Sequence, residues 1–77
     1  MILIVELNET TKYIINMDFV LEIRYNSSNE RHCIEIFPNN GSQPWVWTFK
    51  NKESLDKAYN DIIYPKNNIV VIKEGLA

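Results

Sequence analysis

The chain has 77 residues, of which 45% are hydrophobic and 23% charged, as in an average globular protein. This length predicts one small domain over residues 1–77 and excludes a dinucleotide-binding fold of ordinary size. The formal charge of −2, without any run of Lys or Arg, argues against a nucleic-acid partner. A single cysteine, Cys33, and a single histidine, His32, argue against an internal disulfide and a zinc site.

The first third of the chain is typical of strands. Residues 2–7 are mostly β-branched or aliphatic and lead into the polar residues 8–11, so together with residues 12–16 they predict a hairpin. In residues 19–25 apolar and charged side chains alternate, which predicts a third strand. Its apolar face holds Phe19, Leu21, Ile23 and Tyr25.

The rest of the chain predicts two strands, a helix and a final strand. Residues 31–37 and 45–50 flank a turn-forming run with Asn-Gly at 40–41, which predicts a second hairpin. Residues 51–64 have the apolar spacing of a helix with Leu55, Tyr59 and Ile62 inward, and Pro65 ends it. Residues 68–73 predict a last short strand. The order βββββαβ indicates an α+β fold, a curled, mainly antiparallel sheet of five to six strands with one amphipathic helix.

Targeting signals are not evident in the sequence. The first apolar run ends at Glu6 without a preceding basic segment, unlike a secretion signal. No apolar run is long enough to span a bilayer. We therefore expect a cytoplasmic protein without a membrane partner. Frequent Ile, Asn, Lys and Tyr beside few Ala, Gly and Arg favour a low-GC bacterium or its phage as the source.

One charged cluster has the residue types of an active site. It consists of Arg24, Glu30, Arg31, His32 and Glu35. A small sheet ribonuclease can use a carboxylate as base, a histidine as acid and an arginine on the phosphate. However, His32 and Glu35 have an odd separation and should point to opposite faces of one strand. We interpret the cluster as cross-strand ion pairs on a solvated face, and we expect no catalytic residue, no metal and no cofactor.

Three aromatic residues share one face of the fifth predicted strand: Trp45, Trp47 and Phe49. One interpretation places them in the core under the helix. The other makes them an exposed interaction surface for a protein partner, since Trp and Phe are frequent in such surfaces. Stacking of nucleic-acid bases would need flanking cations, and only Lys50 and Lys52 are near.

A resemblance covers about two thirds of the chain. The segments KYIINMDFVLEI and IEIFPNNG, followed by an extended stretch and a short helix, resemble small bacterial and phage proteins of the flagellar FlbD-like family and PH-like single-domain modules. The matching positions are Asn16, Asp18, Val20, Ile23, Gly41 and the helix from Asn51. The resemblance implies a sheet-plus-helix fold and transfers no catalytic residue.

These observations favour a small non-enzymatic protein-interaction module, such as an inhibitor or accessory subunit. The alternative is a small ribonuclease-like or nucleic-acid-acting protein that uses His32, Glu35 and an arginine. A homodimer is also expected, because residues 2–7 and 69–72 have apolar side chains on both faces and one helix covers only one face. Curling of the sheet, or a different partner, would also cover the apolar side chains on the face that the helix leaves open.

Overall fold

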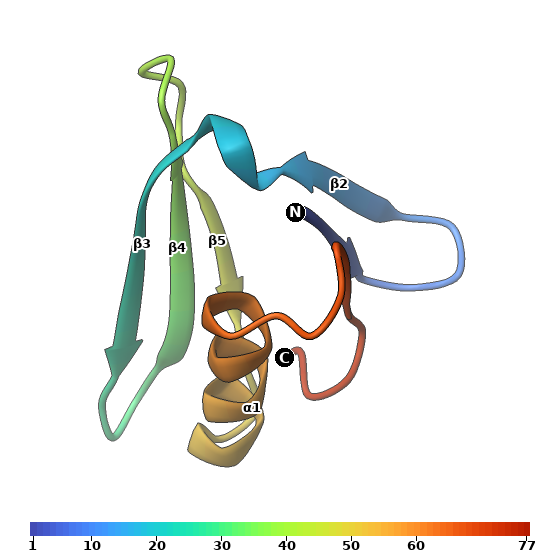
Figure 1. Ribbon diagram of the computed structural model, residues 1–77. Helices are drawn as coiled ribbons and strands as arrows, with labels where there is room; N and C mark the ends of the chain where they lie inside the picture. The colour runs from blue at the N-terminus through green and yellow to red at the C-terminus, as the bar shows by residue number, and fades with distance from the viewer.

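The computed structural model describes residues 1–77 and contains six strands, one α-helix and a short 3-10 helix (Figure 1). In chain order these are β1 (Ile2–Glu6), β2 (Lys12–Asn16), η1 (Met17–Phe19), β3 (Val20–Ser27), β4 (His32–Pro38), β5 (Trp45–Thr48), α1 (Lys52–Ile63) and β6 (Ile69–Ile72). The predicted α+β class is confirmed. Its single α-helix does not combine the length and apolar character that a bilayer crossing requires.

The first sheet has the strand order β2-β1-β6. Its central strand β1 pairs antiparallel with β2, so the predicted first hairpin forms, and parallel with β6. Asn8 stabilises the hairpin turn, because its Oδ1 accepts hydrogen bonds at 2.9 Å from the backbone N–H of Thr10 and Thr11. Leu3 and Val5 are buried on the inner face of this sheet.

The outer face of the first sheet is apolar as well. Ile4 lies opposite Ile14 of β2 and Val71 of β6, and Ile2 lies opposite Ile69. Ile14, Ile69 and Val71 are 70%, 56% and 45% exposed. The first and last strands therefore have apolar side chains on both faces, as the sequence indicated.

The second sheet has the order β3-β4-β5 with all pairs antiparallel. It forms the left side of Figure 1. Ile34 and Ile36 of the central strand β4 are buried on its inner face. The turn between β4 and β5 includes Gly41 with φ of 80°, a backbone conformation that glycine adopts readily.

The prediction of one curled sheet of five to six strands is wrong, because the strands divide between two three-stranded sheets in a different arrangement. The chain turns between them at η1, whose start is capped by Asn16 Oδ1 accepting from the Asp18 N–H at 3.0 Å. Phe19 lies in this turn and Leu21 in a bulge of β3, and they are 62% and 74% exposed. Only Ile23 and Tyr25 keep the predicted common face.

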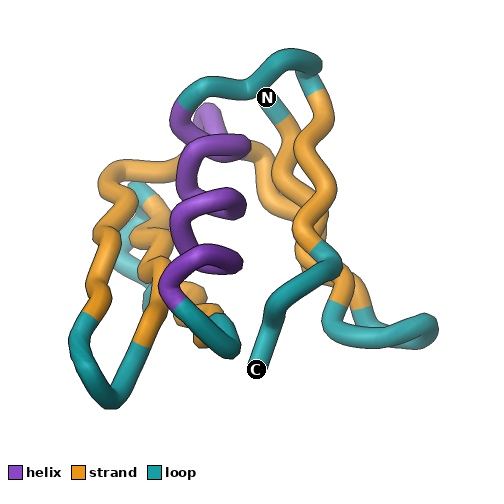
Figure 2. The backbone as a smooth tube through the Cα atoms, turned by 90° about the horizontal axis from the view of Figure 1, so that it is seen from below, coloured by secondary structure: helices purple, strands orange, loops and turns teal.

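The helix prediction is confirmed in position and orientation. Asn51 caps α1 by accepting a hydrogen bond from the Ser54 N–H at 2.8 Å. Leu55, Ala58 and Ile62 are buried, and Tyr59 packs partly buried against the core. Seen from below, α1 lies between the strands of the two sheets (Figure 2).

A single hydrophobic cluster joins both sheets and the helix. Its members come from every strand except β3, from α1, and from Phe49 just after β5: Leu3, Val5, Ile15, Ile34, Ile36, Trp47, Phe49, Leu55, Ala58, Ile62, Val70 and Ile72. Partly buried side chains of β3, Val20 and Ile23, pack against this cluster. Neither sheet has a core of its own, so each depends on the other for burial.

Candidate functional site

The aromatic residues on and after β5 contribute to both the core and the surface. Trp47 and Phe49 are 8% and 4% exposed and belong to the core cluster. Trp45 is partly buried and packs against that cluster. The structure therefore places two of the three residues of the predicted interaction surface in the core, while Trp45 and one side of Trp47 border an open groove.

This groove lies beside β5 and has a volume of about 450 Å³. We call it the β5 groove; it is lined by Leu7, Tyr13, Pro44, Trp45, Val46, Trp47, Thr48, Leu76 and Ala77. None of these side chains is charged. The hairpin of the first sheet supplies one wall, where the Tyr13 ring meets Trp47 edge to face with centroids 6.1 Å apart.

The open edge of β5 forms the floor of the groove. This strand ends the second sheet, so only one of its sides has a neighbouring strand. The last residues of the chain cover part of the free side: the Ala77 N–H donates to the Thr48 carbonyl at 2.9 Å, and the Lys50 N–H donates to the Gly75 carbonyl at 2.8 Å. Trp45 to Trp47 have no such cover and remain an exposed strand edge.

Gly75 allows the end of the chain to take this path. Its φ of 76° is a left-handed conformation, and a Cβ at this position would meet the Ser54 side chain at the start of α1. The turn at Gly75 directs Leu76 to a bridge with Phe49. The groove thus combines segments from both ends of the chain and its middle.

The charged cluster considered as a nuclease site is divided between two faces. His32 Nδ1 lies 3.0 Å from Ser27 Oγ, whereas Glu35 Oε1 accepts a hydrogen bond from Asn26 Nδ2 at 2.7 Å. The two side chains lie on opposite faces of β4, as their odd spacing indicated. Arg24 lies directly opposite Glu35 in the strand register, but the predicted cross-strand ion pair does not form, because Arg24 pairs with Glu22 of its own strand and Glu35 accepts from Asn26.

Arg24 is held mainly by a residue of its own strand. Its Nε donates to Glu22 Oε2 at 2.5 Å, and the guanidinium lies 4.5 Å from the centroid of the Phe37 ring. The hydrogen bond to Arg24 holds the pKa of Glu22 below its ordinary value, and the bond to Glu22 raises the pKa of Arg24. A protonated arginine engaged in this way is a structural group of the outer face.

A second polar network connects β3 to α1. Asp56 accepts hydrogen bonds from the Tyr25 hydroxyl at 2.5 Å and from Lys52 Nζ at 2.6 Å. The rings of Tyr25 and Tyr59 meet edge to face with centroids 5.1 Å apart. The bond from Lys52, followed by that from Tyr25, holds the pKa of Asp56 below its ordinary value, so this carboxyl stays ionised. It fixes the helix against the sheet.

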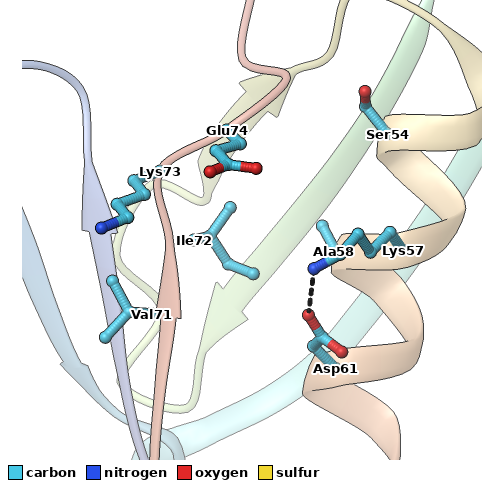
Figure 3. A pocket seen from close by; sticks show the side chains of 8 residues that line it. All are labelled: Ser54, Lys57, Ala58, Asp61, Val71, Ile72, Lys73 and Glu74. Atoms are coloured by element: carbon cyan, nitrogen blue, oxygen red, sulfur yellow. Dashed lines mark hydrogen bonds and ion pairs between the residues drawn. The ribbon is translucent and has the colours of Figure 1, made fainter.

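Another cavity, of about 220 Å³, lies between α1 and the end of β6 (Figure 3). Its charged groups balance: Lys57 pairs with Asp61 at 3.4 Å on the helix, and Lys73 lies beside Glu74 on the other wall. No buried side-chain N or O atom of the protein lacks a hydrogen-bond partner. Ion pairing in this cavity is therefore confined to the Lys57–Asp61 pair of the helix.

No cluster of three or more His, Cys, Asp or Glu side chains has the arrangement of a metal site. Cys33 is a free, buried thiol between Asn26 and Thr48 in the strand register. The adjacent His32 points to the opposite face of β4, so the imidazole and the thiol do not form a pair.

Sequence reasoning identified Trp45 and Trp47 but not the residues that complete the groove. Leu7, Tyr13 and Leu76 belong to segments distant in the sequence, and no local signal places them next to β5. Comparison with protein-family models, curated proteins and solved structures gives no match. The resemblance to FlbD-like and PH-like proteins therefore stays a prediction.

Proposed function

We propose that this chain is a small non-enzymatic protein-interaction module that makes contact through the β5 groove. The observation that supports it is a groove without charged side chains, with aromatic walls, beside an exposed strand edge. Tyr and Trp side chains contribute strongly to protein interfaces, because they bury a large area with few rotatable bonds. An open strand edge adds backbone N–H and C=O groups for pairing.

The groove offers more for recognition than the apolar outer face of the first sheet. The exposed part of that face consists of aliphatic side chains such as Ile14, Ile69 and Val71, without an aromatic ring. It provides burial but few directional groups. In the groove, the Trp45 and Tyr13 rings and the free backbone of Val46 lie together, so a partner gains both area and directed hydrogen bonds.

The ribonuclease-like alternative has no comparable support. Its acid and base, His32 and Glu35, are on opposite faces of β4, and Arg24 is engaged by Glu22. One phosphodiester cannot contact both faces of a strand at once. A phosphate site would also need a cation beside the acid and the base, and the arginine opposite Glu35, Arg24, pairs with Glu22 at 2.5 Å.

The test is affinity capture from cell extracts with the immobilised protein and two charge variants. Leu7→Lys places a charge at the groove wall, where the side chain is 44% exposed. The control Ile14→Lys places the same charge on the outer face of the first sheet, at a residue 70% exposed. A captured protein is then purified and its binding measured directly by calorimetry.

We expect binding to be lost with Leu7→Lys and retained with Ile14→Lys, since a buried unpaired lysine at an interface typically weakens binding at least tenfold. Equal capture by all three proteins would place the contact elsewhere on the surface. Binding lost only with Ile14→Lys would assign it to the outer face of the first sheet. Either result would contradict the proposal.

A further inference from the structure

The exposed edge of β5 has a hydrogen-bonding pattern that can be worked out residue by residue. The Phe49 N–H donates to the His32 carbonyl of β4 at 2.8 Å, so the backbone of Phe49 faces the neighbouring strand. Thr48 and Lys50 bond to the end of the chain on the other side. The backbone N–H and C=O groups of successive residues point to alternate edges of a strand. Those of Val46 therefore point to the free edge, like those of Thr48, and those of Trp45 and Trp47 point to β4.

Val46 is therefore the centre of a short free edge with two different ends. On one side Pro44 has no N–H and stops regular pairing. On the other side Ala77 already occupies the position opposite Thr48. Between these limits, Val46 presents one N–H and one C=O without a strand neighbour. A strand that pairs here has room for about three residues. Its central residue must donate a backbone hydrogen bond to the Val46 C=O and accept one from the Val46 N–H.

The sequence of this free edge is the same in both directions. Trp45-Val46-Trp47 reads identically from either end. In an antiparallel pair centred on Val46, the Val46 N–H of each chain meets the Val46 C=O of the other, and Trp45 of each lies opposite Trp47 of the other. The two-fold axis passes between the two valines. No charged side chain lines the groove on either copy, so no like-charged side chains meet.

We propose that a second copy of this chain occupies the β5 edge and joins the two second sheets into one six-stranded sheet, β3-β4-β5-β5-β4-β3. This inference rests on the proposed function and names the first partner of the β5 groove. A two-fold axis perpendicular to the sheet keeps both inner faces on one side, so the two grooves adjoin, with Trp45 of one copy beside Trp47 of the other. The joined groove is then the surface offered to a further protein.

The test measures molar mass by sedimentation equilibrium from micromolar concentration to about 1 mM, the range of a weak dimer with a small interface. The wild type is compared with the variants Val46→Lys and Val46→Glu, alone and mixed in equal amounts. Val46 is 40% exposed and outside the core cluster, so both variants keep the fold. Tryptophan fluorescence and far-UV circular dichroism verify this.

We expect the wild type to approach the mass of two chains with rising concentration. Each variant alone stays monomeric, because like charges face each other across the two-fold axis. Their mixture forms a heterodimer, because opposite charges are then cross-strand neighbours. Val46→Thr, which keeps the N–H and adds no charge, dimerises like the wild type.

Three results would overturn the inference. A wild type that is monomeric throughout excludes the second copy as occupant of the edge. Variants that dimerise as well as the wild type place the dimer on another surface, such as the outer face of the first sheet. Monomeric variants that fail to associate when mixed exclude the register centred on Val46. In each case the capture experiment with Leu7→Lys still decides the proposed function, because it detects a different protein in the groove.

Discussion

Asp56 is the residue through which polar contacts fasten β3 to α1. It lies on the exposed side of the helix and still accepts two hydrogen bonds, from Lys52 and from Tyr25. Because these bonds favour the carboxylate, they hold its pKa below the ordinary value of 3.8. The associated stability is fully present above that value and is lost as the pH falls through the lower pKa of the folded protein.

The hydroxyl of Tyr25 can be removed without removing its ring. In Tyr25→Phe the edge-to-face contact with Tyr59 remains, but one of the hydrogen bonds that lower the pKa of Asp56 is lost. We expect the pKa of Asp56 to move upward toward its ordinary value, as measured by NMR titration of the side-chain carboxyl carbon. Tyr64→Phe is the matched control, since Tyr64 is 74% exposed and has no contact with Asp56. An unchanged pKa in Tyr25→Phe would show that Lys52 alone holds the carboxylate.

Two glycines with left-handed backbone differ in what surrounds them. Gly41 has φ of 80° and open space where a Cβ would lie, whereas a Cβ at Gly75 would meet the Ser54 side chain. Gly41→Ala should cost only the backbone strain, about 1 kcal/mol. Gly75→Ala adds the clash with Ser54 and should cost about 2–4 kcal/mol in urea unfolding. Equal losses in the free energy of unfolding would show that the Ser54 side chain moves away from the added methyl group without cost.

At the scale of single elements, the sequence predicts most of the structure. Period-two runs and turn residues located each strand to within about two residues, and the apolar spacing of α1 identified its buried face. These signals are local, since each depends only on residues that are close together in the sequence. The short helix η1 was not predicted, because Asn16-Met17-Asp18 has the composition of an ordinary turn.

The buried face of α1 gives a test with two adjacent isoleucines. Ile62 is 6% exposed and belongs to the core, while Ile63 is 37% exposed. Ile62→Ala should lower the free energy of unfolding by about 2–4 kcal/mol, because it leaves a cavity between helix and strands. Ile63→Ala makes the same chemical change and should cost less than about 1 kcal/mol. Urea denaturation of both variants measures the difference, and similar losses would mean that the helix face has been assigned incorrectly.

At the scale of the whole molecule, the sequence was less informative, because pairing between strands is a long-range property. The alternation in β1 is the same whether it pairs with β6 or with β3. The parallel pairing of β1 with β6 splits the strands into two sheets, and it joins segments near the two ends of the chain. The β5 groove depends on this split, since Tyr13 of the first sheet packs on Trp47 of the second. A groove between two sheets has no counterpart in a single curled sheet.

Sharing one core should make the two sheets unfold together. Both tryptophans belong to β5 in the second sheet, so their fluorescence follows the packing of β5, whereas circular dichroism reports on the strands of both sheets and the helix. Leu3 is fully buried in the first sheet, and Leu3→Ala should lower the stability measured by tryptophan fluorescence by about 2–5 kcal/mol. Ile14→Ala, on the exposed outer face of the same sheet, should leave the fluorescence transition within about 0.5 kcal/mol of the wild type. Far-UV circular dichroism should give the same midpoint as fluorescence for each protein. If Leu3→Ala shifts the circular dichroism transition while the fluorescence transition stays in place, the two sheets unfold separately and the core is not a single cooperative unit.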